Sequence, residues 1–206
     1  MRLTFTINEA KTSLLIIILT LLSFSLSAQQ LAFPTASGAG AYVTGGRGKP
    51  VYIVTNLNDS GPGSFRQCLE DTKLTDGGII TFAVSGTINL SSEIYFYHQD
   101  NITIAGQTAP EGGITIANHR FRMQNVNNFI MRYIRLRPNF DPYPGTELDP
   151  LEYFNAHDYI IDHCSFSWGT DEAAESGIGH TYTWQRNLFA ESNKTGMIIG
   201  YDASES

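Results

Sequence analysis

After its first thirty residues, the chain alternates apolar and polar positions with a period of two, in short bursts. This period is typical of β-strands that have one buried face. Examples are KPVYIVTNL, GGIITFAVSGTINL, NVNNFIMRYIRLRP and HDYIIDHCSFSW. The exception is SGPGSFRQCLEDTK, where Phe65, Cys68 and Leu69 recur at helical spacing behind Ser64, a residue type suited to capping a helix N-terminus. The pattern therefore predicts an all-β protein with one short helix, at Ser64 to Leu69.

The later bursts can be aligned with one another. Those that start at Ile102, Phe129, Tyr159 and Tyr182 are separated by 27, 30 and 23 residues. A loose period in this range, made of short strands and turns, indicates a solenoid in which each coil covers the apolar face of the one below. A β-sandwich also has short strands, but it favours tight hairpin turns, and Asp76-Gly77 is the one close match. We therefore predict a right-handed, single-stranded parallel β-helix, with the short helix as its N-terminal cap.

The two ends of the chain carry separate expectations. The first residues contain the basic side chains Arg2 and Lys11, and the apolar run TSLLIIILTLLSFSLSA follows them and ends in small residues. A basic segment, an apolar segment and small residues in this order are typical of a secretory signal peptide. The apolar core is shorter than the roughly 20 residues of a membrane-spanning helix. We expect a signal peptide at residues 1–28, a β-helix domain at residues 29–206, and a secreted or periplasmic protein without a membrane anchor. Because the sequence stops after a strand-like burst, we expect the β-helix to be truncated at its C-terminal end.

Charge narrows the choice of ligand. The chain has 13 Lys and Arg residues against 20 Asp and Glu residues, a formal net charge of −7, and it contains no basic run, which argues against a nucleic-acid partner. An anionic ligand would need a local basic group or a bound metal to overcome this average field. The two cysteines, Cys68 and Cys164, do not form a disulfide framework, and we expect buried free thiols.

Carboxylates cluster in two segments. Asp171, Glu172 and Glu175 follow the strand-like run YIIDHCSFSW, and Glu147 and Asp149 alternate in TELDP. If the coil that starts at Asp149 stacks under the coil that ends at Glu175, four carboxylates meet on one outer surface. Oxygen ligands in that number suit Ca²⁺, whereas Zn²⁺ would need a His or Cys pair at ligand spacing. A solvated acidic loop is the alternative explanation.

Three further residues have two interpretations each, and a fourth, Asp162, has one. His163 is either a base or a hydrogen-bonded residue in the wall of the coil stack, and the adjacent Asp162 would support the acidic cluster from behind. Trp168 and Tyr201 would either stack on sugar rings or pack within the protein.

Several segments together resemble a known family. NLNDSGPGSFRQCLE, ITFAVSGTINL, NITIAGQTAP and YIIDHCSFSWGTDEAAE, followed by NKTGMIIG, resemble the pectate lyases of polysaccharide lyase family 1, in that family's order. The resemblance implies a pectin-lyase-like β-helix and a secreted enzyme that cleaves de-esterified homogalacturonan by β-elimination with Ca²⁺. It assigns a substrate carboxylate to Lys194. The metal ligands that it implies are Glu147, Asp149, Asp171 and Glu175, with Glu172 as a substitute.

The chain also departs from the family. Glu147 and Glu175 stand where aspartate is usual, which leaves the exact coordination open. The family's base is an arginine that would come after Ser206, so no catalytic residue is expected within this chain and the fragment alone is expected to be inactive. The arginines that do not occupy its position are Arg120, Arg122, Arg132, Arg135, Arg137 and Arg186.

Two other functional classes stay open. One is a noncatalytic β-helix that binds polysaccharide, and the other is a pectin-active glycoside hydrolase of the same fold that uses two carboxylates. The expected partner in the leading hypothesis is an anionic plant cell-wall polysaccharide, pectate, bound by a monomer.

Overall fold

The computed structural model describes residues 12, 14, 29–138 and 147–200. The chain divides into two compact units, residues 1–30 and 31–206. The predicted signal peptide at residues 1–28 lies almost entirely outside the described residues and stays a prediction. Among the described residues, no helix is both long and apolar enough to cross a membrane. The architecture described below belongs to the second unit.

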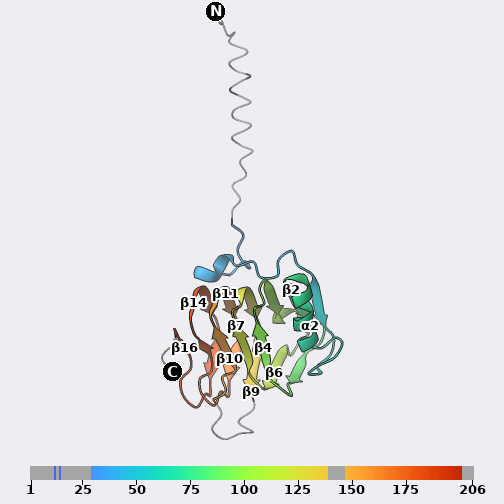
Figure 1. Cartoon of the computed structure of the whole chain (residues 1–206), viewed down its shortest axis with the longest axis vertical. Coiled ribbons are helices and arrows are strands. Elements are labelled where there is room, and N and C mark those ends of the chain that lie inside the picture. The colour runs from blue at the N-terminus through green and yellow to red at the C-terminus, as the bar shows by residue number, and fades with distance from the viewer. Residues whose placement is uncertain (1–11, 13, 15–28, 139–146, 201–206) are drawn as a thin grey trace, which may run out of the picture. The chain divides into compact units, whose positions relative to one another are not determined.

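Short strands in this unit wind into coils, and each strand pairs with its equivalent in the next coil (Figure 1). Sheet A contains β1 (Val51–Val54), β2 (Gly78–Phe82), β5 (Ile102–Ala105), β8 (Asn127–Arg132), β11 (Ala156–Asp162) and β14 (Gly179–Gln185). Sheet B contains β3 (Gly86–Asn89), β6 (Ile114–Asn118), β9 (Ile134–Pro138), β12 (Ser165–Ser167) and β15 (Leu188–Ala190). Sheet C contains β4 (Ile94–Tyr97), β7 (Phe121–Gln124), β10 (Leu151–Phe154), β13 (Glu175–Ser176) and β16 (Ile198–Ile199).

The chain visits sheets A, B and C in that order in each coil, and five coils follow one another in this way. All strand pairings among the described residues are parallel. The predicted parallel β-helix is therefore confirmed. A β-sandwich is excluded, because its sheets are antiparallel.

The register of sheet A reproduces the repeat that is visible in the sequence. Ile102 pairs with Phe129, Phe129 with Tyr159, and Tyr159 with Tyr182. The first three side chains are fully buried, and the rings of Tyr159 and Tyr182 stack with their centroids 5.0 Å apart. The spacings of 27, 30 and 23 residues are thus the lengths of successive coils.

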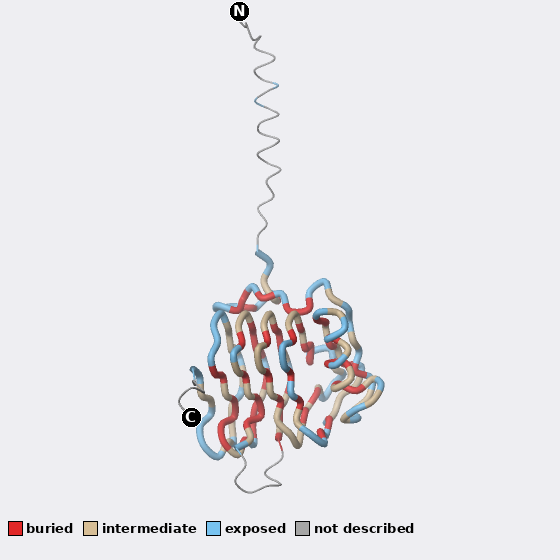
Figure 2. Tube along the Cα trace, in the orientation of Figure 1, coloured by how far each residue is buried: buried red, intermediate tan, exposed pale blue. Residues whose placement is uncertain are grey.

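The core runs along the inside of the coils. Buried positions alternate with partly exposed ones along many of the strands, as Figure 2 shows, because successive side chains of a strand point to opposite faces. One inward row joins Ile80, Ile104, Met131 and Ile161 across four coils, and all four are buried. Burying a side chain of this size stabilises the fold by roughly 1.5–3 kcal/mol.

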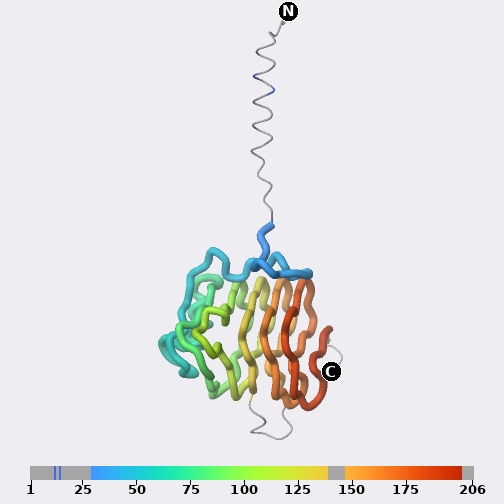
Figure 3. The backbone as a smooth tube through the Cα atoms, turned by 180° about the vertical axis from the view of Figure 1, so that it is seen from behind, coloured from blue at the N-terminus to red at the C-terminus, as the bar shows by residue number. Residues whose placement is uncertain are grey.

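The segment before β1 runs across the outer face of sheet A (Figure 3). Phe33 and Val43 from this segment form a small apolar cluster with Ile130 and Ile160, which point outward from the sheet. A side chain at Gly40 would collide with the carbonyl oxygen of Tyr159, so only glycine permits this close approach. The segment therefore covers part of sheet A and leaves the other two sheets free.

The helix that the sequence predicts is α2 (Phe65–Thr72), which ends three residues after the expected end at Leu69. The Ser64 hydroxyl accepts a hydrogen bond from the Gln67 backbone N–H at 3.1 Å, as an N-cap residue does. Phe65 and Leu69 are buried, and the Phe65 ring lies 5.7 Å from that of Phe82 in β2. The helix therefore packs against the first coils, as expected of a cap.

Both cysteines are free and buried, as predicted. Burial raises the pKa of Cys68 to about 11 and that of Cys164 to about 12, so neither thiol ionises near neutral pH. They act as small apolar residues in the core.

Candidate functional site

The predicted site residues lie on stacked turns that lead from sheet B to sheet C, except Glu175, which begins β13. The turn before β10 carries Glu147 and Asp149, the turn before β13 carries Asp171 and Glu172, and the turn before β16 carries Lys194. These turns belong to three successive coils, so residues distant in the sequence become vertical neighbours.

Backbone hydrogen bonds hold these turns in register. The Thr170 N–H donates to the Leu148 carbonyl at 2.9 Å, and the Lys194 N–H donates to the Asp171 carbonyl at 3.0 Å. The Thr170 hydroxyl also accepts from the Leu148 N–H at 2.9 Å. The turns therefore continue the parallel pairing of the sheets, which places Lys194 over Asp171.

The Lys194 side chain bridges two of the predicted carboxylates. Its Nζ lies 2.7 Å from Oδ1 of Asp171 and 3.3 Å from Oε1 of Glu147. The side chain of Asp171 is only 8% exposed, whereas those of Lys194 and Glu147 are 54% and 76% exposed. Hydrogen bonds to Asp171 and then Glu147 raise the pKa of Lys194 well above its usual range. The ammonium group is thus fixed at the exposed edge of the acidic cluster, the name used here for the carboxylates of Glu147, Asp149, Asp171, Glu172 and Glu175.

Asp149 lies behind this edge and is buried. Its Oδ1 accepts a hydrogen bond from the Glu172 N–H at 2.8 Å. Burial, together with repulsion by Glu172, Glu175 and Asp171, raises the pKa of Asp149 to about 8, although the hydrogen bond from the Glu172 N–H acts in the opposite direction. Without a cation, the Asp149 carboxyl is therefore mostly protonated at neutral pH.

Glu172 and Glu175 complete the acidic cluster. Burial raises the pKa of both, and the main neighbour that adds to the rise is Asp171 for Glu172 and Glu152 for Glu175. The part of each rise that comes from neighbouring carboxylates indicates that these groups repel one another within the cluster. Either protons or a cation would relieve this repulsion.

The cluster has the donor chemistry of a hard-cation site. The predicted ligands offer only carboxylate oxygens, which suit Ca²⁺ rather than a softer metal. Within the described part of the chain, however, no three His, Cys, Asp or Glu side chains are arranged to hold a metal ion. The Lys194 ammonium instead supplies positive charge between Glu147 and Asp171. The residues fit calcium in kind, and the assignment of the ligands stays a prediction.

Sequence reasoning missed the charged row on sheet C beside this cluster. Glu152 in β10 pairs in register with Arg122 in β7 on one side and with Glu175 in β13 on the other. Oε1 of Glu152 lies 2.9 Å from Nε of Arg122, and its Oε2 lies 3.2 Å from Nη1 of Arg120. The alternation of Arg120 with Arg122 indicated that both share one face, but only the register of the coils brings them to Glu152.

Asp162 does not support the acidic cluster, and that expectation is wrong. It ends β11 in sheet A, and its buried carboxylate binds Arg132 through Nε at 2.7 Å and Gln185 through Nε2 at 2.7 Å. Nδ1 of His163 lies 2.8 Å from its Oδ2, and the His163 ring stacks on Tyr133 at 4.7 Å. These contacts favour the interpretation of His163 as a wall residue.

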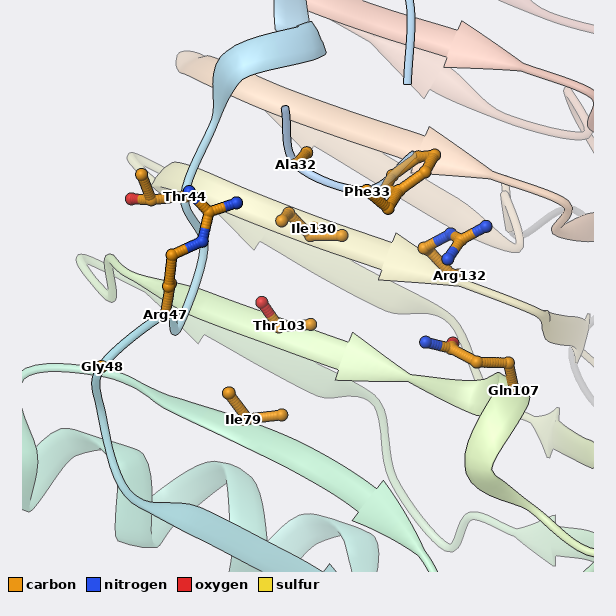
Figure 4. Close-up of a pocket in the computed structure, with 10 residues that line it drawn as sticks. All are labelled: Ala32, Phe33, Thr44, Arg47, Gly48, Ile79, Thr103, Gln107, Ile130 and Arg132. Carbon is orange, nitrogen blue, oxygen red and sulfur yellow. The ribbon is translucent and has the colours of Figure 1, made fainter. Parts of the chain in front are cut away.

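A pocket on the outer face of sheet A is likewise separate from the acidic cluster (Figure 4). It has a volume of about 230 Å³ and lies between the N-terminal segment and strands β2, β5 and β8. Phe33 and Arg132 lie along one side of it, with the Arg132 guanidinium 3.7 Å from the Phe33 ring centroid. None of the predicted site residues lines this pocket.

Trp168 lies at the start of the turn that carries Asp171, and its side chain is exposed. Its Nε1 donates to Oε2 of Glu191 at 2.7 Å, and the Arg137 guanidinium lies 5.8 Å from its ring centroid. Tyr201, the other aromatic residue considered for sugar stacking, lies outside the described residues.

The fold and the site together define a parallel β-helix protein with an acidic cluster and one lysine on stacked turns. No family model matches the chain. It is 40% identical over 166 residues to a protein of Emericella nidulans named probable pectate lyase C, covering 80% of this chain and 38% of that protein. A protein of the same name from Aspergillus fumigatus is 39% identical over 181 residues, with 87% and 41% covered.

More distant proteins agree with these relatives. Probable pectate lyase 4 of Arabidopsis thaliana is 29% identical over 175 residues, covering 82% of this chain and 45% of that protein. The crystal structure of the major allergen from cedar pollen matches with a TM-score of 0.54 at 20% identity, covering 72% of this chain and 47% of that chain, and so shares the fold. The resemblance to pectate lyases is thus confirmed. The chain spans about two fifths of the length of the curated relatives described here.

Proposed function

We propose that the chain supplies the calcium-binding and substrate-carboxylate-binding part of a secreted pectate lyase, which cleaves de-esterified homogalacturonan by β-elimination. The observation that carries this proposal is the position of Lys194, whose ammonium lies at the exposed edge of the acidic cluster, where carboxylates repel one another. The similarity to proteins named probable pectate lyase supports the same activity. Export rests on the signal-peptide pattern of residues 1–28.

Calcium would be held by Asp149, Asp171 and Glu175, with Glu147 or Glu172 completing the set. When bound, the ion would neutralise these carboxylates and contribute positive charge where the substrate becomes more negative. The raised pKa values of Asp149 and Glu175 support this assignment, because they are the response expected of carboxylates that lack a cation.

Lys194 has a distinct role in the proposal. Removal of the C5 proton of a galacturonate unit builds negative charge on the adjacent carboxylate, and an ammonium group beside that carboxylate stabilises the charge as it develops. The pair with Glu147 is highly exposed, and such pairs are weak, so a substrate carboxylate can replace Glu147 as the partner of Lys194. The buried Asp171 would keep the lysine in place during this exchange.

No base is assigned among the described residues. Arg122 in β7 and Arg120 directly before it are both paired with Glu152. We therefore expect the chain by itself to bind the polysaccharide without turning it over. This expectation also keeps a second function open, a noncatalytic β-helix that binds anionic polysaccharide through the same lysine.

Product analysis tests the proposal. A protein that includes this chain is incubated with polygalacturonate, with calcium or with a chelator, and both new reducing ends and ultraviolet-absorbing unsaturated ends are measured. A lyase yields both kinds of end in calcium and neither in chelator. Reducing ends alone would indicate a hydrolase, and calcium-dependent retention on a polygalacturonate gel without products would indicate a binding protein. The absence of both turnover and retention would contradict the proposal.

A further inference from the structure

The outer face of sheet B carries two cations that the proposed reaction does not use. Arg135 and Arg137 alternate along β9 around the buried Leu136, so both point outward. Within the described part of the chain, neither forms an ion pair with a carboxylate. By contrast, Arg66 and Arg132 each lie 2.7 Å from a carboxylate oxygen. In a chain of net charge −7, two adjacent cations without a direct ion pair among the described residues are unexpected.

Small side chains beside these arginines leave a hollow. Arg135 pairs in register with Thr115 of β6, and Arg137 pairs with Ala117. One coil further, Thr115 pairs with Thr87 and Ala117 pairs with Asn89. The long arginine side chains therefore stand next to a shallow polar surface, and the resulting pocket has a volume of about 430 Å³. This is the size range of a small-ligand site.

Both guanidinium groups are held in place but keep free donors. Arg137 donates through Nη1 to the Leu136 and Ser165 carbonyls at 2.8 Å and through Nη2 to the Ser165 hydroxyl at 2.6 Å. Arg135 donates through Nε to the Thr115 hydroxyl at 2.8 Å and through Nη2 to the Gly112 carbonyl at 2.6 Å. Since a guanidinium has five N–H donors, two remain on Arg137 and three on Arg135 after these contacts.

The local charge favours an anion. Burial lowers the pKa of Arg137 and repulsion by Arg135 lowers it further, and attraction to Glu191 only partly offsets these two effects. A bound anion would relieve this repulsion, and the remaining N–H groups of a guanidinium match the two oxygens of a carboxylate.

Trp168 provides an aromatic wall to the same pocket. Trp168 as a whole is 45% exposed, and its backbone has a φ of 70°, a conformation that bulky residues rarely adopt. The hydrogen bond from Nε1 to Glu191 fixes the ring beside Arg137. An exposed, fixed indole next to polar groups offers a flat apolar face to a ligand that is also hydrogen-bonded.

We propose that this surface, formed by Arg135, Arg137 and Trp168 and here named the arginine face, is a second binding site, for an anionic saccharide. A carboxylate of the saccharide binds the free guanidinium donors, the sugar ring stacks on Trp168, and Asn89 and Asn118 lie within the pocket to meet the hydroxyl groups. The arginine face lies on a different sheet from the acidic cluster and needs no calcium. This proposal depends on the proposed function only in that galacturonate is chosen as the probe.

Tryptophan fluorescence in chelator tests this proposal separately from the calcium site. The full chain is titrated with trigalacturonate in EDTA at low salt, with galactotriose as the uncharged control. We expect a saturable change with trigalacturonate alone. The chain contains two tryptophans, so loss of the change in Trp168→Phe would assign it to the arginine face rather than to Trp184. A Lys194→Ala variant should respond like the wild type, whatever the outcome at the acidic cluster.

Charge variants complete the test. The double variant Arg135→Gln with Arg137→Gln should bind trigalacturonate about 100-fold more weakly, since each lost charge-assisted contact costs at least about tenfold. Lys49→Gln with Lys73→Gln removes the same charge elsewhere and should change affinity less than about threefold, as expected of screened charges at a distance. If the double variant does not fold, Arg137→Lys keeps the charge, loses the forked geometry and should still weaken binding. No response in chelator, equal binding by the arginine variants, or an identical response to sulfate would each overturn the proposal.

Discussion

The Nζ atom of Lys194 lies 2.7 Å from Oδ1 of Asp171, and the backbone N–H of the same lysine donates to the Asp171 carbonyl at 3.0 Å. Backbone and side chain of Lys194 therefore meet the same residue of the preceding coil. The backbone bond comes from the general pairing of coils, so it places the lysine independently of its charge. The ion pair then fixes the end of the side chain, where a substrate carboxylate would bind.

Replacing Lys194 by alanine should weaken binding of oligogalacturonate while changing stability little. The side chain is more than half exposed, so its loss opens no cavity, although Asp171 loses its counter-charge. Calorimetric titration with trigalacturonate in calcium and thermal melting of both proteins check this. Lys73→Ala is the matched control, because Lys73 also forms an exposed pair, with Glu70 at 2.6 Å. Normal binding with a large fall in melting temperature would assign Lys194 a structural role instead.

Stability in chelator should fall as pH rises from about 4 to 8. Asp149 keeps its proton up to about pH 8 in the folded state but loses it near pH 4 in the unfolded chain, so the folded state binds more protons over this window. The raised pKa values of Glu172 and Glu175 act in the same direction. Melting temperature measured against pH checks the slope, and Asp149→Asn should flatten it. A stability that rises through this window would contradict the described environment of Asp149.

Much of the fold was predictable because a β-helix repeats. Phe129 and Tyr159, aligned by their distance in the sequence, are direct register partners, since a coil must close before the next strand can pair. The helix start at Ser64 was predictable from a local capping signal, which needs no tertiary information. The apolar spacing predicted the helix only as far as Leu69. The helix continues to Thr72, since packing against the first coils extends it beyond this pattern.

The site was less predictable, because turns stack by backbone pairing that the sequence does not reveal. The vertical contact of Lys194 with Glu147 spans 47 residues and two coils. Asp162 looked like a partner of the acidic cluster because it is close to Asp171 in the sequence, yet the two lie on different parts of the coil. From the sequence, Arg135 and Arg137 were noted only as arginines that do not occupy the position of the expected base. That neither pairs with a carboxylate among the described residues is visible only in the structure.

Replacing Asp162 by asparagine should destabilise the fold by about 3–5 kcal/mol, because it leaves the surrounding cations without a buried counter-charge. Oδ2 of Asp162 lies 2.7 Å from Nη2 of Arg132, and its Oδ1 lies 3.3 Å from Nη1 of Arg186. Burial alone would raise the pKa of Asp162, but hydrogen bonds from His163, Gln185 and Arg132 outweigh it, and the pKa is lowered. The contribution to stability is therefore present above about pH 4 and is lost as pH falls through the lowered pKa.

Urea unfolding at pH 7 and at pH 3 checks this prediction. The difference between wild type and Asp162→Asn should be large at pH 7 and smaller at pH 3, because pH 3 lies below the ordinary pKa near 4 that the Asp162 carboxyl has in the unfolded chain. The exposed Asp76→Asn variant, which loses a surface pair with Lys49, is the control and should differ little from wild type at either pH. Equal stability of Asp162→Asn and wild type at pH 7 would show that the network around Asp162 does not contribute.

Calcium should raise the melting temperature of the wild type, and the acidic cluster should account for the rise. A ligand that binds only the folded state at 100 times its dissociation constant contributes about 2.7 kcal/mol, or about 5–10 °C for a chain of this size. Asp171→Asn removes one predicted ligand and the partner of Lys194, so it should abolish most of the shift. Asp162→Asn melts at a lower temperature but should keep the full shift, since its contacts lie on sheet A.

The measurement is a calcium titration of the melting temperature at pH 7, with magnesium as the control ion. Calcium should also shift the pH dependence described for Asp149, because a bound cation favours the ionised carboxylates and releases their protons. A second test is therefore proton release on adding calcium to an unbuffered solution of the folded protein, which Asp149→Asn should reduce. If the wild type melts at the same temperature in calcium and in chelator, and no protons are released, the acidic cluster is a solvated surface and the calcium assignment is wrong.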